Sequence, residues 1–152
     1  MISDRIYSRF TRGISARALR RIGKLNVPIY RLSRGRLMGN VGKAPVLLLT
    51  TTGRKSGQQR TAPVLYRADG DRLIVIGSNA GNANTPAWSL NLQAKPDALV
   101  DVRGDKREVR ARIAEGEERK RLWRAMNDQF GGFDDYKVAT DRDIKVFVLD
   151  RR

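Results

Sequence analysis

The chain has 152 residues and carries 31 lysines and arginines against 16 acids, a formal net charge of +15. It contains no cysteine and no histidine, which excludes disulfides, Cys/His zinc sites, thiol nucleophiles and Ser-His-Asp triads. No side chain titrates near neutrality at its unperturbed pKa, so an enzyme of this composition would depend on a bound cofactor for its chemistry. The length fits one domain, and the charge favours anionic partners.

The positive charge is concentrated at the N-terminus, where residues 1–44 contain eleven lysines and arginines but a single acid. From Ile2 to Ile22 an apolar side chain recurs every four positions with arginines between, which is typical of a basic amphipathic helix. Gly23 is expected to end this helix, and a second short helix is expected to start near Pro28.

Two interpretations of this N-terminal region stay open. It can attach peripherally to anionic lipid, or it can be an arm that packs on the domain or on a second subunit. We predict a basic helical arm over residues 1–43 and a cofactor-binding domain over residues 44–152. No apolar run is long enough to span a bilayer and no signal peptide is recognisable, which predicts a cytoplasmic protein that touches the inner face of the membrane at its periphery.

From residue 44 onward the pattern changes to strands. Strands are expected at 46–51, 61–68, 72–78, 99–103, 106–114 and 144–149, with tight turns at Asp69-Gly70 and Gly104-Asp105. A helix is expected to start at Thr85 as N-cap and to stop before Lys95, and a second helix is expected over 117–130. Six strands with a few helices predict a small β-barrel with helical decoration, mainly β in class.

A polar loop between the first two strands is the candidate binding element. Gly53 and Gly57 let the backbone turn tightly, while Arg54, Lys55 and Arg60 supply positive charge. Such a loop is suited to an anion such as phosphate, although a solvated turn has the same composition. The spacing is neither that of a P-loop nor that of a Rossmann fingerprint.

Several motifs occur together in one order. They are Leu-Leu-Leu-Thr-Thr-Thr-Gly-Arg-Lys-Ser-Gly-x-x-Arg-Thr-x-Pro, then Gly-Ser-Asn, then Pro-Ala-Trp-x-x-Asn-Leu, and finally Asp-Tyr…Thr-Asp-Arg. With this combination the chain resembles the deazaflavin-dependent nitroreductase family, split β-barrel proteins of the FMN-binding split barrel-like kind that bind coenzyme F420. The resemblance covers roughly residues 40–150, and the motifs together are far more specific than any one of them.

The resemblance implies a six-stranded split β-barrel and a set of site residues. The phosphate and the acidic oligoglutamate tail of F420 would be held by Gly53, Arg54, Lys55, Ser56, Arg60 and Thr61. The deazaflavin ring would lie along Pro63, Leu65, Gly77, Ser78, Asn79, Pro86, Ala87, Trp88 and Asn91. Reduced F420 would pass a hydride to an electron-poor acceptor such as a quinone or a nitro compound, with Tyr136 and Ser78 hydrogen-bonded to the acceptor or supplying a proton.

Three alternatives accompany this interpretation. The same barrel could use FMN, which needs phosphate contacts but has no polyanionic tail. A basic nucleic-acid-binding module is the alternative outside enzymes, but aromatic residues make up only 7% and do not alternate with the basic clusters, so no nucleic acid is expected. Trp88 could belong to the core rather than to the cofactor site. No metal site is expected, and the protein is predicted to be a monomer or a homodimer.

Overall fold

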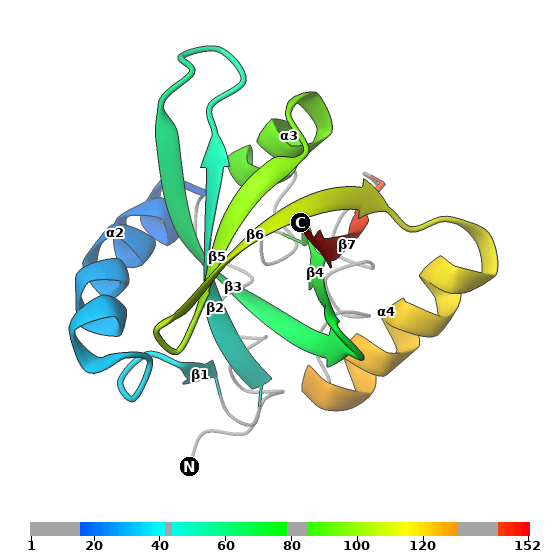
Figure 1. Ribbon diagram of the computed structural model, residues 1–152, viewed down its shortest axis with the longest axis horizontal. Helices are drawn as coiled ribbons and strands as arrows, with labels where there is room; N and C mark the ends of the chain where they lie inside the picture. The colour runs from blue at the N-terminus through cyan, green and yellow to red at the C-terminus, as the bar shows by residue number, and fades with distance from the viewer. Residues whose placement is uncertain (1–15, 42–43, 79–84, 131–142) are drawn as a thin grey trace.

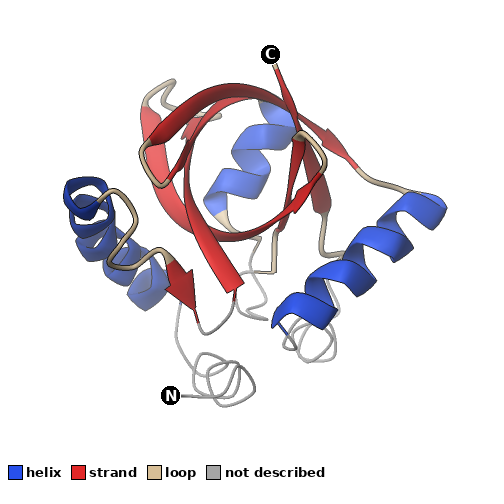
Figure 2. Cartoon of the chain, turned by 60° about the horizontal axis from the view of Figure 1, so that its bottom comes forward, coloured by secondary structure: helices blue, strands red, loops and turns tan. Residues whose placement is uncertain are grey.

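The computed structural model describes residues 16–41, 44–78, 85–130 and 143–152, and its strands form a closed barrel (Figures 1 and 2). The described elements are α2 (Ala16–Ser33), β1 (Asn40–Val41), β2 (Ala44–Thr52), β3 (Gln59–Asp69), β4 (Arg72–Ile76), α3 (Ala87–Ala94), β5 (Asp97–Val102), β6 (Asp105–Ile113), α4 (Gly116–Phe130) and β7 (Val146–Arg151).

The barrel consists of six antiparallel strands in the order β2-β3-β4-β7-β6-β5, and pairing of β2 with β5 closes it. The short β1 adds to β2 outside this ring. Figure 2 looks along the barrel and shows α3 across one end, while α2 and α4 lie on the outside. The predicted six-stranded barrel with helices is therefore confirmed.

Apolar side chains on both faces of the barrel wall explain its continuous hydrophobic strands. In β2, Leu47 and Leu49 point into the barrel, whereas Val46 and Leu48 pack against α2 outside. Because neighbouring residues of a strand point to opposite faces, a strand covered on both sides must be apolar at successive positions. Helix α4 covers the other outer face with the buried side chains Leu122, Trp123, Met126 and Phe130.

The N-terminal helix differs from its prediction. Residues Ala16–Ser33 form one helix that continues through Gly23 and contains Pro28, so the expected end at Gly23 is wrong. The intrinsic cost of one glycine in a helix is only about 1 kcal/mol, and the burial of an apolar face against the barrel can exceed it. Most of the four-residue apolar stripe, from Ile2 to Ile14, lies outside the described residues.

Tyr30 anchors α2 to the barrel. Its side chain is 1% exposed and its hydroxyl donates to the carbonyl oxygens of Val46 (2.9 Å) and Asp101 (3.2 Å). The same oxygen accepts a hydrogen bond from the backbone N–H of Arg103 at 2.9 Å. Burial is the main reason why the pKa of Tyr30 is raised, which keeps the hydroxyl protonated. The arm predicted over residues 1–43 thus includes a helix that packs on the barrel, and its separation at residue 43 stays a prediction.

Three predicted positions, those of two hairpin turns and of one helix N-cap, are each wrong by one residue. The second hairpin turns at Arg103-Gly104 rather than at Gly104-Asp105, and both residues have positive φ (52° and 91°), as a type I′ turn requires. The first hairpin likewise turns at Gly70-Asp71. Thr85 is not the N-cap of α3, because the cap position is taken by Pro86, whose backbone is extended and whose ring offers no acceptor.

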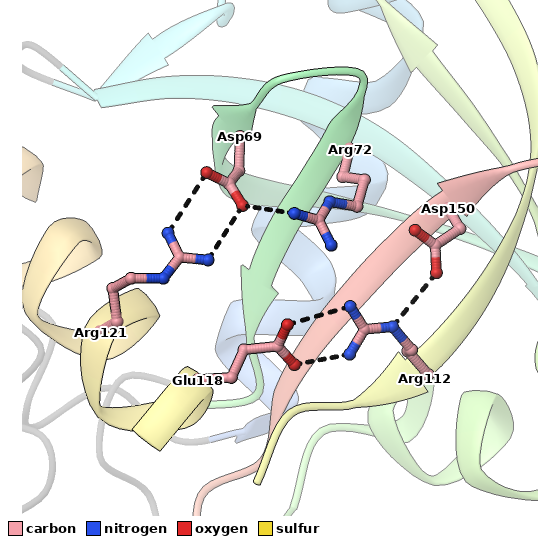
Figure 3. A network of polar contacts seen from close by, with 6 residues as sticks. All are labelled: Asp69, Arg72, Arg112, Glu118, Arg121 and Asp150. Carbon is pink, nitrogen blue, oxygen red and sulfur yellow. Dashed lines mark hydrogen bonds and ion pairs between the residues drawn. The ribbon is translucent and has the colours of Figure 1, made fainter. Parts of the chain in front are cut away.

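Polar contacts fasten α4 to the strands beneath it (Figure 3). The guanidinium of Arg112 forms a bidentate pair with Glu118 (2.6 and 3.1 Å) and also reaches Asp150 at 3.3 Å. Arg121 of α4 binds the carboxylate of Asp69 at the β3–β4 turn. The hydrogen bonds from Arg112 lower the pKa of Glu118, so its charge persists in mild acid. On this side of the molecule, Arg112 and Arg121 therefore have acidic partners.

Candidate functional site

The loop between β2 and β3 has a defined shape. Its ends are closed by a hydrogen bond from Gly53 N–H to Gln58 O (2.7 Å), and Gly57 N–H donates to Gly53 O (2.8 Å). A Cβ at Gly53 would lie 2.6 Å from Ser56 Oγ, and Gly57 has φ +70°, so both positions favour glycine. The glycines predicted to allow a tight turn do so, and they present the side chains between them to solvent.

Asn91 of α3 holds this loop in place. It is 4% exposed; its side-chain oxygen accepts from the backbone N–H of Arg54 (3.0 Å), and its amide donates to Thr51 Oγ1 (3.0 Å). Thr51 itself is 1% exposed. Asn91 was predicted from the family motif to lie along the cofactor ring, and that contact stays a prediction. The sequence did not indicate that Asn91 fixes the loop, because its hydrogen bond with Arg54 joins residues 37 positions apart.

The side chains predicted for the anion site are exposed on this loop and at the start of β3: the cations Arg54, Lys55 and Arg60 and the hydroxyl of Ser56. Ser56 Oγ accepts from Gln58 N–H at 3.2 Å, which fixes the loop further. Within the described ranges, no acid lies at ion-pair distance from Arg54, Lys55 or Arg60. This differs from the α4 side, where Arg72, Arg112 and Arg121 all have acidic partners.

The side chains predicted to contact the cofactor ring lie in two places, one along β3 and the other at the end of the barrel that α3 covers. Pro63 and Leu65, predicted to contact the ring, alternate along β3 with Thr61, predicted to hold the phosphate or tail. All three face outward, since Leu65 packs against the clusters under α2 and α4, whereas Val64 packs inside. Thr61 Oγ1 lies 2.8 Å from Thr50 Oγ1 on the adjacent strand. The loop adjoins both places, because it leads directly into β3 and is bound by Asn91 of α3 (Figure 1).

The second place is the end of the barrel that α3 covers. Gly77 follows β4 and packs so closely on Ser89 that a Cβ would lie 3.1 Å from Ser89 Oγ. Ser78 is 8% exposed and Pro86 is buried, whereas Ala87 is exposed. Trp88 is half-buried and packs on Phe147 inside the barrel, with ring centroids 5.8 Å apart. Trp88 therefore contributes to the core, and its contact with a cofactor stays a prediction.

Two predicted site residues, Asn79 and Tyr136, lie outside the described residues. Tyr136 was the first choice for hydrogen-bonding the acceptor. Ser78, the second choice, is described.

The donor set of the loop suits the anionic part of a deazaflavin cofactor. Two arginines and one lysine without acidic partners provide donors for a phosphate and for carboxylates, and guanidinium groups bind both in a bidentate manner. Near the loop, the described residues supply no thiol or imidazole, as the composition requires. The site is built to bind and orient, and chemistry at neutral pH would come from the group that it holds.

Comparison with known proteins agrees with this donor set. The family model described as F420H(2)-dependent quinone reductase matches residues 22–151. Rv3178 of Mycobacterium tuberculosis, named provisionally as such a reductase, is 41% identical over 105 residues, covering 69% of this chain and 88% of that protein. The F420H(2)-dependent quinone reductase Rv1261c of the same organism is 35% identical over 133 residues, covering 85% and 89%.

Solved structures extend the comparison to the fold. A structure described as an F420-H2 dependent reductase (FDR-A) matches with a TM-score of 0.65 and 32% identity, over 70% of this chain and 94% of that one. Another, described as a domain-swapped dimer, matches with a TM-score of 0.67 and 30% identity, over 84% and 95%. Since the family model covers most of the chain and the fold agrees, this chain belongs to the F420H(2)-dependent quinone reductase family.

Proposed function

We propose that this chain is a reductase that binds F420 at the loop of residues 53–60 and acts on a quinone. The main support for this proposal is the loop itself. Hydrogen bonds hold its backbone in place, and its cations Arg54, Lys55 and Arg60 have no acidic partner among the described residues. Family membership supports F420 as the cofactor and quinone as the acceptor class. Reduced F420, when bound, supplies a hydride from C5 of its deazaflavin ring.

The protein contributes position and electrostatics. Arg54, Lys55 and Arg60 bind the phosphate and the acidic tail, and thereby fix where the ring lies relative to the acceptor. Tyr136 is the first candidate to donate a hydrogen bond to a reduced oxygen, and Ser78, which is buried just after β4, is the second. Reduction of nitro compounds, the other predicted acceptor class, stays a prediction. So does the homodimer, for which the domain-swapped relative is a precedent.

Cofactor identity is tested by titrating the purified protein with F420, FMN and a random oligonucleotide. We expect F420 to bind more tightly than FMN, and its affinity to fall as salt rises, because its tail and the loop attract each other through partly exposed charge. The oligonucleotide should compete with F420 only weakly. Equal or tighter binding of FMN would contradict the proposal, and so would an F420 affinity that is insensitive to salt.

We also propose that α2 contacts an anionic membrane, where a hydrophobic quinone would be found. Of the six exposed large apolar side chains among the described residues, five lie between Leu25 and Met38. Leu25, Ile29 and Leu32 are spaced to share one helix face, and Leu25 and Leu32 are 71% and 89% exposed. Basic residues flank this face, as in interfacial helices. None of the helices among the described residues has the length and apolarity needed to cross a bilayer.

Cosedimentation with anionic vesicles tests this contact. Replacing Leu25 and Leu32 by serine should reduce the bound fraction severalfold, because each buried leucine contributes up to about 2 kcal/mol of transfer free energy. The matched control is Leu99→Ser, since Leu99 is also exposed (39%) but lies on β5 of the barrel. If the double variant pellets with vesicles as well as the Leu99→Ser variant does, this face of α2 is not the membrane contact.

A further inference from the structure

One arginine of α2 reaches across to the strand that leaves the anion-binding loop. Nη2 of Arg31 lies 3.3 Å from Thr61 Oγ1, and Thr61 directly follows Arg60 in β3. The same threonine oxygen is held by Thr50. Helix α2 therefore borders the outer face of β3 where the candidate site begins. Arg31 stands 30 positions from Thr61 in sequence, so no local motif would have pointed to it.

Helical geometry places two further cations on the same edge of α2. Arg17 and Lys24 precede Arg31 by two and one heptads, and a helix drifts only about 20° per heptad, so the three side chains share one edge. All three are exposed. We call Arg17, Lys24 and Arg31 the α2 cationic edge. At a rise of about 1.5 Å per residue it extends about 21 Å toward the end of the barrel that carries the loop (Figure 1).

The charge on this edge has no acidic partner in the part of the chain that the structure describes. No aspartate or glutamate occurs between residues 16 and 44, and none of the described acids forms an ion pair with the α2 cationic edge. Arg31 contacts Thr61, which follows Arg60 in β3, so positive charges of α2 and of the loop region adjoin at this strand and repel each other. A polyanion lying between loop and helix would offset that repulsion.

We propose that the α2 cationic edge and the loop of residues 53–60 form two walls of one groove, which binds the distal carboxylates of a long oligoglutamate tail. The proposal rests on the proposed function, in which F420 is the cofactor. The loop cations take the phosphate and the first carboxylates. Each further glutamate adds a carboxylate that extends along α2, where exposed guanidinium and ammonium groups bind it. The edge therefore sets the preference for tail length and leaves the binding of the ring unchanged.

Tail-length dependence of binding tests the groove. We would titrate the wild-type protein, Arg31→Ala and Arg31→Ala/Lys24→Ala with F420 that carries no glutamate, one glutamate or a long oligoglutamate tail. The matched control is Arg36→Ala, because Arg36 is an exposed cation of the same arm that lies beyond the end of α2. Thermal unfolding of each variant would verify that the fold is retained.

For the wild-type protein, the long tail should bind about tenfold more tightly than the form without glutamate at low salt. Arg31→Ala should weaken binding of the long tail by about two- to fivefold and the double variant by about tenfold, with little change for the form without glutamate. Arg31→Lys should retain most of the preference, and Arg36→Ala should retain all of it.

Two results would overturn the groove while leaving the proposed function intact. One is an affinity independent of tail length in the wild-type protein. The other is an equal loss for all three cofactor forms in Arg31→Ala, which would mean that Arg31 acts through Thr61 on the loop. If no form of F420 binds the wild-type protein, the proposed function itself fails. If Arg36→Ala loses the tail preference as Arg31→Ala does, the effect is one of overall charge and the groove is rejected.

Discussion

Replacing Lys55 and Arg60 together by alanine is expected to weaken F420 binding by about 2 to 6 kcal/mol. Hydrogen bonds to charged groups contribute about 1 to 3 kcal/mol each, and the two side chains come from different positions of the loop region, so their effects should roughly add. Binding titrations of both single variants and the double variant would measure this loss. Because both residues are exposed and form no described ion pair, the fold should be unaffected.

The control for this prediction removes the same charge elsewhere. Lys106 and Arg124 are exposed, and Lys106→Ala/Arg124→Ala changes the net charge by the same amount far along the chain from the loop. If that control loses as much affinity as Lys55→Ala/Arg60→Ala, long-range attraction explains the binding. Wild-type affinity in Lys55→Ala/Arg60→Ala would restore the interpretation of the loop as a solvated turn.

Tyr30→Ala is expected to be the most destabilising single substitution in the arm, at about 3 to 5 kcal/mol. The substitution removes a buried ring that packs with Val27, Val46 and Leu48, and it leaves the N–H of Arg103 without its partner. Small domains have only about 5 to 15 kcal/mol of stability in total, so this loss should be evident in chemical or thermal unfolding. Tyr30→Phe keeps the ring and should cost about 1 to 3 kcal/mol.

The packing of Tyr30 on the barrel also changes what we expect when the N-terminal arm is removed. Because the assigned site residues begin at Gly53, the sequence alone predicts that a chain starting near Met38 still binds F420. The buried Tyr30 leads us to expect a loss of stability instead, because truncation exposes Val46 and Leu48 to water. A truncated chain that melts at the wild-type temperature and binds F420 would show that the arm is independent. If Tyr30→Phe and Tyr30→Ala both melt like the wild type, α2 does not contribute to the stability of the barrel.

The sequence predicted best what depends on local pattern. Alternating apolar residues and Gly-containing turns located all six barrel strands within a few residues, and the helix over 117–130 matches α4 closely. The glycines and cations of residues 53–60 indicated an anion-binding loop, and the structure shows the tight turn and the exposed charges. The two hairpin turns differed from their predictions by one residue, and the N–H of Arg103 in the second turn is bound by Tyr30, a distant contact that no local signal reveals.

The sequence by itself indicated the chemistry: the absence of His and Cys favours a bound cofactor, and the motif order indicates which one. Only the tertiary structure decided how distant segments meet. It joins α2 to β2 and β5 through Tyr30, fixes the loop through Asn91, and brings Arg31 to Thr61. No local pattern encodes these contacts, because each joins residues far apart in the chain. Packing of α2 on the outer face of the barrel buries apolar side chains, and this gain overrides the helix-ending tendency of Gly23.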